Sequence, residues 1–238
     1  TARVRREKLP LDHVWVSRYT PLKRAARMQH RPFNGPSDPK VACEEFVQRC
    51  RQYGVGNWRE NQPFDERADT LLRNYGPPAK IPQEVEGVPA TDWFDYQDGE
   101  FRLANAGQWA ELVDDPAASD GHAVRMPGDH FEWATSLPFS NDIASLNPAW
   151  HVYVVARCDA TTKEGMAMTM GIYDSAEKKS VTQQSVTVEQ AAGASYHVFD
   201  LGSHLLSDSM YLWVAPPKRP GDVQSVYVDR VFIVRDSK

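Results

Sequence analysis

The sequence predicts a mainly β protein, a jelly-roll β-sandwich of about ten strands preceded by a small α-helical segment. From residue 93 onwards, short runs that alternate apolar with polar side chains follow one another at roughly 8–12-residue spacing, with turn residues between them. Before residue 77, apolar residues recur instead at the spacing of a helix face. No fixed-period repeat is visible, which argues against a propeller or a solenoid.

The pattern divides the chain into three parts. Residues 1–76 form the helical segment, 77–92 a Pro-rich linker and 93–238 the β-sandwich. The linker is predicted because the stretch GPPAKIPQEVEGVPATD carries four prolines and two glycines, which interrupt regular structure and mark connecting segments. The chain begins TARVRREK, with no initiator Met and no signal-peptide pattern, so we expect it to be a fragment of a longer protein.

Four elements, a strand and three helices, are predicted in the helical segment. The stretch LDHVWVSRY (11–19) alternates well enough to predict a strand, and a helix is expected to follow it with Thr20 as N-cap and Pro21 in the first helical position. Residues 39–54 predict a second helix, capped by Asp38 and closed by a glycine. FDERADTLLRNYG predicts one more helix, again closed by a glycine.

The net charge of −5 combines a basic front with an acidic remainder. Residues 1–90 carry 16 Lys and Arg against 11 Asp and Glu, and residues 91–238 carry 11 against 21, so their net charges are +5 and −10. The acidic part would repel phosphate, and the basic residues are scattered over helix faces. No apolar run is long enough for a membrane helix. We therefore expect neither nucleic acid nor a membrane as a partner.

No motif for catalysis is convincing in this sequence. HExxH, GxSxG and CxxC are absent. Asp114 and Asp115 are adjacent, so on a strand they would point to opposite faces and could not act on one sugar. We expect them to cap the following turn. Cys43, Cys50 and Cys158 are expected to be buried thiols, with a Cys43–Cys50 bridge as the less favoured alternative.

Two motifs carry a resemblance to a known class of protein. The turn DPAASDGHA (115–123) and the terminal strand VYVDRVFIVR (226–235) are similar to the β-sandwich carbohydrate-binding modules of polysaccharide-degrading proteins. The front, with LDHVWVSRYTPLKRAARM and ACEEFVQRCRQYGVGNWRE, resembles the tail of an α-glucuronidase-like domain of unknown function. The resemblance implies a (β/α)₈ barrel upstream of Thr1 that holds any catalytic carboxylates. Only Asp115, Ser119, Asp120, Gly121 and Asp229 match the sandwich motif.

The resemblance also implies a structural calcium, because sandwich modules of this class often hold one between the first and last strands. Calcium binds carboxylate, amide and carbonyl oxygens. Asp95 and Gln97 on the first strand could meet Asp229 on the last, and these three residues are the predicted metal ligands. The alternative is that they are solvated charges at strand ends.

Aromatic residues are the best candidates for binding a sugar, because sugar rings stack their CH-rich faces on aromatic rings. Trp133 lies in HFEWA beside polar side chains, and Trp150 begins a strand after a loop; for both, packing in the core is the alternative. Asp120 is a polar residue on a loop, and Tyr173 lies on a strand. The predicted carbohydrate-binding residues are Trp133, Trp150, His130, Arg125, Asp120 and Tyr173.

Three hypotheses for function follow. The first is a non-catalytic module that binds a polysaccharide, neutral or anionic, and is covalently linked to an upstream catalytic barrel. The second is an accessory domain that braces that barrel and binds no ligand. The third is an autonomous glycosidase or lyase, which would need a cleft with two carboxylates or a Tyr/His pair. Because glycan-degrading proteins act outside the cytoplasm, an extracellular or periplasmic location is expected.

Overall fold

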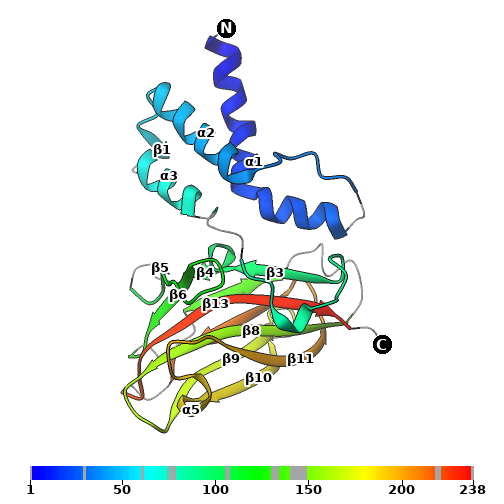
Figure 1. Ribbon diagram of the computed structural model, residues 1–238, viewed down its shortest axis with the longest axis vertical. Helices are drawn as coiled ribbons and strands as arrows, with labels where there is room; N and C mark the ends of the chain where they lie inside the picture. Colours follow the sequence, from blue (N-terminus) through cyan, green and yellow to red (C-terminus); the bar gives the residue numbers. More distant parts are fainter. Residues whose placement is uncertain are drawn as a thin grey trace. The chain divides into compact units, whose positions relative to one another are not determined.

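The computed structural model describes residues 2–28, 31–59, 62–73, 75, 79–104, 108–129, 134–139, 149–217 and 221–236. The chain forms two compact units, Thr1–Pro78 and Ala79–Lys238. Unit 1 holds three helices and a short hairpin among its described residues, and unit 2 holds two antiparallel β-sheets (Figure 1).

The strand predicted for residues 11–19 is wrong, because this stretch lies inside the helix α1 (Ala2–Met28). Its apolar residues serve a helix face: Val16 and Tyr19 are buried three residues apart. Tyr19 packs edge-on against Phe33, with ring centroids 5.1 Å apart. The alternating pattern in the sequence therefore reflects one side of a helix and not one face of a sheet.

Helix α1 is kinked at Arg18, where φ is −130° and ψ is 16°. Pro21 explains the kink, because proline has no N–H to donate and its ring crowds the carbonyl four residues earlier. The next helix, α2 (Pro39–Gln52), begins as predicted. Its N-cap is Asp38, whose Oδ1 accepts a hydrogen bond from the Val41 N–H at 3.0 Å.

The helices of unit 1 share a hydrophobic core. A hairpin of β1 (Asn57–Arg59) and β2 (Gln62–Pro63) leads into α3 (Phe64–Arg73). The core is formed by Val16, Tyr19, Cys43, Phe46, Val47, Cys50, Phe64, Ala68, Leu71 and Tyr75. Both cysteines of this core are free, as is Cys158 of unit 2, so the prediction of buried thiols is confirmed. Burial raises the pKa of the Cys43 thiol to about 11, which leaves it protonated and unreactive at neutral pH.

Residues 79–92, the described part of the predicted linker, belong to unit 2. The segment forms the 3-10 helix η1 (Gln83–Val85), and Val85 is only 2% exposed. Val85 packs against Val155 and Phe232 of the neighbouring sheet. The proline-rich composition therefore belongs to a segment that covers a sheet and not to a free connector.

Unit 2 is a sandwich of two antiparallel sheets, which confirms the predicted fold class. One sheet has the strand order β10-β9-β12-β7-β4, and the other has the order β11-β8-β13-β6-β5, with β3 also paired to β13. The strands of the first sheet are β4 (Arg102–Leu103), β7 (Thr135–Pro138), β9 (Met166–Asp174), β10 (Lys179–Thr187) and β12 (Met210–Ala215). Those of the second are β3 (Trp93–Gln97), β5 (Glu111–Asp114), β6 (His122–Pro127), β8 (Ala149–Ala160), β11 (His197–Leu205) and β13 (Val223–Arg235).

The core of unit 2 lies between the two sheets. Alternate residues of each central strand are fully buried, as strand geometry requires for the inward face. On the first sheet these include Met168, Met170, Ile172, Leu212 and Val214; on the second they include Val152, Val154, Ala156, Val226 and Val228. The other residues of these strands point outward, and the two outward faces differ in what covers them.

Candidate functional site: an aromatic face on the five-stranded sheet

The outward face of the five-stranded sheet carries partly exposed aromatic side chains. On β12, Tyr211 and Trp213 alternate with the buried Leu212 and Val214, so both rings lie on the outer side. On β9, Tyr173 is partly exposed in the same way. We call this surface the aromatic face; its residues are Arg102, Ser136, Pro138, Gly171, Tyr173, Ser180, Gln183, Tyr211 and Trp213.

The strand register places these residues in two rows that run across the strands. Directly paired residues of antiparallel strands lie on the same face. The first row is Arg102, Ser136, Trp213, Gly171 and Gln183, on β4, β7, β12, β9 and β10. The second row is Pro138, Tyr211, Tyr173 and Ser180, on β7, β12, β9 and β10. Aromatic rings thus occupy the middle of the sheet, and polar side chains flank them except at the Pro138 end of the second row.

The two tyrosines form a pair in the second row. The rings of Tyr173 and Tyr211 have centroids 5.6 Å apart and planes inclined by 44°. Burial, with the neighbouring Tyr173 as a second cause, raises the pKa of Tyr211. The Tyr211 hydroxyl therefore stays protonated at neutral pH, when it can donate and accept a hydrogen bond.

Trp213 leans over Gly171, its partner on the adjacent strand. A Cβ placed on Gly171 would lie 3.1 Å and 3.2 Å from the indole atoms Cζ2 and Cε2. The absence of a side chain at this position lets the indole lie across the neighbouring strand. The ring therefore offers a flat, partly exposed surface in the centre of the aromatic face.

Replacing Gly171 with alanine is expected to lower the free energy of unfolding by about 1–3 kcal/mol, the usual cost of overpacking. The added methyl would meet the Thr182 backbone oxygen at 2.5 Å as well as the indole of Trp213, and backbone cannot give way as a side chain can. Urea unfolding of the variant against the wild type measures this. An unchanged free energy of unfolding would contradict the described packing of Trp213 on Gly171.

The chemistry of this face suits a ligand with both apolar and hydroxyl groups. Three aromatic rings present apolar surface, and the exposed side chains of Ser180, Gln183 and Arg102 in the same rows supply donors and acceptors. Sugars have this combination, since their CH groups stack on rings and their hydroxyls need fixed polar partners.

On the outward face of the six-stranded sheet, in contrast, the region around Arg157 is occupied by contacts within the chain. On β8, Arg157 donates to Asp115 Oδ2 through Nη2 at 2.9 Å and through Nε at 3.2 Å, and to Asp159 Oδ1 through Nη1 at 2.6 Å. Its guanidinium lies 3.8 Å above the ring of Tyr227. Tyr196 donates its hydroxyl to Asp115 Oδ2 at 2.7 Å. This network ties the turn after β5 to the sheet and is structural.

The predicted metal ligands do come together on this second sheet. Gln97 donates from Nε2 to Asp95 Oδ2 at 2.6 Å, and Ser119 donates from Oγ to Asp229 Oδ1 at 2.8 Å. The Arg230 guanidinium lies 3.5 Å from Asp95 and 3.9 Å from Asp229. Within the described residues, no group of three or more His, Cys, Asp and Glu is arranged to hold a metal ion.

As arranged, these residues do not fit a calcium ion, because Arg230 already supplies the positive charge beside Asp95 and Asp229. A structural calcium in unit 2 stays a prediction, which a comparison of melting temperatures in calcium and in chelator tests.

Asp98, next to this cluster, predicts a pH-dependent stability. The residue is 5% exposed, and burial, with the charges of Asp120 and Asp229, raises its pKa to about 7. A folded-state pKa above the unfolded one means that the native state binds the extra proton. The stabilisation is thus complete below about pH 4 and is lost as the pH rises through 7.

In the presence of chelator, we therefore expect the free energy of unfolding to fall by about 2–4 kcal/mol between pH 5 and pH 8, because Asp98 loses its proton over this range. Asp98→Asn should flatten the profile, and chemical unfolding at each pH measures it. A variant whose profile matches the wild type would contradict the assignment to Asp98.

The four predicted binding residues that the structure describes do not lie together in the fold. Tyr173 lies on the aromatic face. Arg125 pairs with Glu111 on the other sheet, and Asp120 accepts a hydrogen bond from the His122 N–H at 3.1 Å in the turn before β6. Trp133 and His130 lie outside the described residues.

The structure corrects the prediction that Trp150 binds carbohydrate. The ring is 1% exposed and packs on Phe94, with centroids 5.3 Å apart. Trp150 shares its strand phase with the buried Val152 and Val154, so it points into the core, and its ring is not available to a ligand.

Trp213 and Tyr211 are the functional candidates that the sequence-based selection omits. The signal for them is present in MYLWVA, where one phase is aliphatic and the other aromatic. In a strand with one buried face, the aliphatic phase takes the core and the aromatic phase is left outside.

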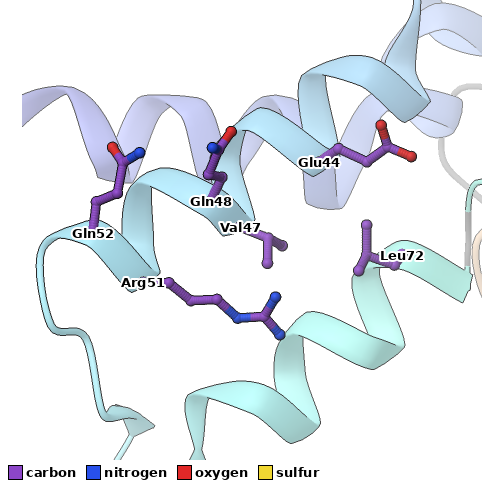
Figure 2. Close-up of a pocket in the computed structure, with 6 residues that line it drawn as sticks. All are labelled: Glu44, Val47, Gln48, Arg51, Gln52 and Leu72. Atoms are coloured by element: carbon purple, nitrogen blue, oxygen red, sulfur yellow. The ribbon is translucent and has the colours of Figure 1, made fainter.

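A separate pocket lies in unit 1 between α2 and α3, with a volume of about 340 Å³. Figure 2 shows Val47 and Leu72 at this space, while Gln48 and Gln52 point away from it. Arg51 is held by Asp65 at 3.1 Å, and both side chains are largely exposed. Polar groups do not converge on the space as they do in ligand sites, so we do not assign it a ligand.

No family model and no curated protein matches the chain. Among solved structures, it is similar to carbohydrate-binding modules. The xylan-binding CBM22-1 domain of Paenibacillus barcinonensis Xyn10C is 8% identical, with a TM-score of 0.43 over 60% of this chain and 95% of that one. The C-terminal family 22 module of Clostridium thermocellum Xyn10B is 13% identical, with a TM-score of 0.45 over 63% and 98%. TmCBM61, in complex with β-1,4-galactotriose, is 12% identical, with a TM-score of 0.36 over 67% and 100%.

Proposed function

We propose that unit 2 is a non-catalytic carbohydrate-binding module and that a polysaccharide lies across its aromatic face. The observation that supports this is the set of three partly exposed rings, Tyr173, Tyr211 and Trp213, in register with polar side chains on one outward sheet face. An outward row of aromatic residues is what stacking on sugar rings requires.

The dimensions of the face favour a chain over a single sugar. Neighbouring strands lie about 4.8 Å apart, so the row from Arg102 to Gln183 spans roughly 19 Å. A ligand in this row would contact several consecutive sugar units, with Trp213 beneath the middle of the chain.

Binding is favoured over hydrolysis by the composition of the face. Glycoside hydrolysis uses two carboxyl groups that flank the scissile bond. In the described part of the chain, neither row of the aromatic face contains an Asp or a Glu. The face thus offers stacking surface and hydrogen-bond partners without the acid and base of a glycosidase.

We further propose that the chain belongs to a larger polysaccharide-degrading protein that resembles an α-glucuronidase-like parent with an upstream barrel. A tethered module raises the local concentration of substrate at the catalytic domain. Such a protein acts extracellularly or in the periplasm. In the described residues, no helix has the length and apolar character to span a membrane.

A polysaccharide panel tests the proposal. Xylan, galactan, mannan, polygalacturonate and glucuronoxylan are compared by affinity electrophoresis and calorimetry, each with calcium and with chelator. We expect the folded chain to bind at least one of them and to release no reducing ends. A folded chain that binds none would favour the accessory role of bracing an upstream domain, and turnover by the chain alone would favour an enzyme.

A further inference from the structure

Arg102 differs from the other arginines of unit 2. It is exposed on β4, and no hydrogen bond or ion pair joins its side chain to another residue in the described part of the chain. Each of the other described arginines of this unit pairs with a carboxylate: Arg125 with Glu111, Arg157 with Asp115 and Asp159, Arg230 with Asp95 and Asp229, and Arg235 with Asp92. The other described guanidinium groups of this acidic unit are paired with carboxylates. The guanidinium of Arg102 is therefore available to a ligand.

Arg102, whose guanidinium has no partner in the described part of the chain, lies at one end of the first row of the aromatic face. Arg102 pairs with Ser136, and Ser136 pairs with Trp213. Two strand spacings, about 10 Å, therefore separate the backbone of Arg102 from that of Trp213. An extended arginine side chain can reach a substituent on a ligand whose neighbouring unit stacks on the indole.

The aromatic face around Arg102 differs in charge from the rest of unit 2. Residues 91–238 have a net charge of −10, yet the described residues of both rows include no carboxylate. A negatively charged ligand would be repelled by most of this unit but not by the aromatic face. Guanidinium groups bind carboxylate and sulfate through two parallel hydrogen bonds, which gives geometric selectivity as well as affinity.

We infer that the aromatic face takes an acidic polysaccharide, in which a carboxylate or sulfate group pairs with Arg102 while a neighbouring sugar stacks on Trp213. This inference rests on the proposed function and adds the class of glycan to it. Arg102 is the residue that selects a charged chain over a neutral one.

A charged residue on β4 also suits its place at the end of the sheet, since charges on edge strands prevent pairing with other chains. That role predicts self-association when the charge is lost. It does not predict any change in the preference between acidic and neutral glycans, so this preference is the readout that separates the two roles.

The test uses chemically matched glycans. Polygalacturonate and glucuronoxylan are compared with their carboxyl-reduced forms, and a sulfated galactan with its desulfated form, by calorimetry at low and high salt. We expect the wild type to bind an acidic form about two- to fivefold more tightly, as for an exposed ion pair, and expect added salt to reduce the difference. Arg102→Gln should bind both forms of a pair equally. Lys163→Gln, an exposed residue in the loop between β8 and β9, removes the same charge elsewhere and should keep the preference.

The outcomes are distinguishable. Preference for the uronates or for the sulfated chain supports the inference and identifies the acidic group. Equal binding of acidic and neutral forms by the wild type overturns the inference and leaves the proposed function in place, as does an acidic preference that survives Arg102→Gln. Failure of the folded wild type to bind any of these glycans overturns both.

Discussion

Replacing Asp115 with alanine is expected to lower the free energy of unfolding by about 3–5 kcal/mol, the cost of breaking a buried ion pair. Asp115 is 7% exposed and accepts hydrogen bonds from Arg157, Tyr196 and the Ala117 N–H. Burial alone would raise its pKa, but these hydrogen bonds outweigh burial and hold the pKa below the usual value. The variant would leave the Arg157 guanidinium undercompensated. Denaturant unfolding followed by tryptophan fluorescence measures the loss.

The adjacent carboxylate is a matched control. The side chain of Asp114 is 84% exposed and contacts only His122 among the ion pairs of the described residues. Asp114→Ala is therefore expected to change the free energy of unfolding by no more than about 0.5 kcal/mol. Equal costs for the two variants would show that the network around Arg157 does not stabilise unit 2.

Replacing Trp213 with alanine is expected to weaken glycan binding at least tenfold, or about 1.4 kcal/mol. Trp213 is the largest ring of the aromatic face and lies in the centre of its first row. Its side chain points outward and is partly exposed, so stability should change much less than affinity. Calorimetry with the glycan that the panel identifies gives the affinity, and thermal unfolding gives the stability.

Trp109→Ala is the control for this change. Trp109 is also partly exposed, but it lies in the turn before β5 and outside the aromatic face. Its removal should leave the affinity unchanged. A Trp213→Ala variant that binds as tightly as Trp109→Ala and the wild type would exclude the indole as a stacking surface.

The sandwich could be predicted from the sequence because alternation and turn residues are local signals. Runs such as MYLWVA and VQSVYVDRVFIVR show their strands directly. The same rule failed at residues 11–19, where a short alternating stretch lies on one side of α1. The proline content of residues 79–92 predicted a linker, but composition does not show that Val85 packs against Val155 and Phe232.

The site was harder to predict, because it depends on which strands become neighbours. Tyr173 could be selected as an aromatic residue on a strand, but its pairing with Tyr211 arises from the contact of β9 with β12, and no local pattern encodes that contact. Trp150 was selected for its place after a loop, yet its phase with Val152 and Val154 puts it in the core. The phase of each strand was readable from the sequence; the register between strands was not.

Chemical-shift mapping of a bound oligosaccharide tests the central claim most directly. A soluble fragment of the polysaccharide that binds is titrated into isotope-labelled protein, and amide shifts are followed along the chain. We predict that the largest shifts cluster at Ser136, Gly171, Tyr173, Tyr211 and Trp213, on three adjacent strands of one sheet. Shifts confined to the six-stranded sheet or to the pocket between α2 and α3 would contradict the assignment of the aromatic face as the binding site.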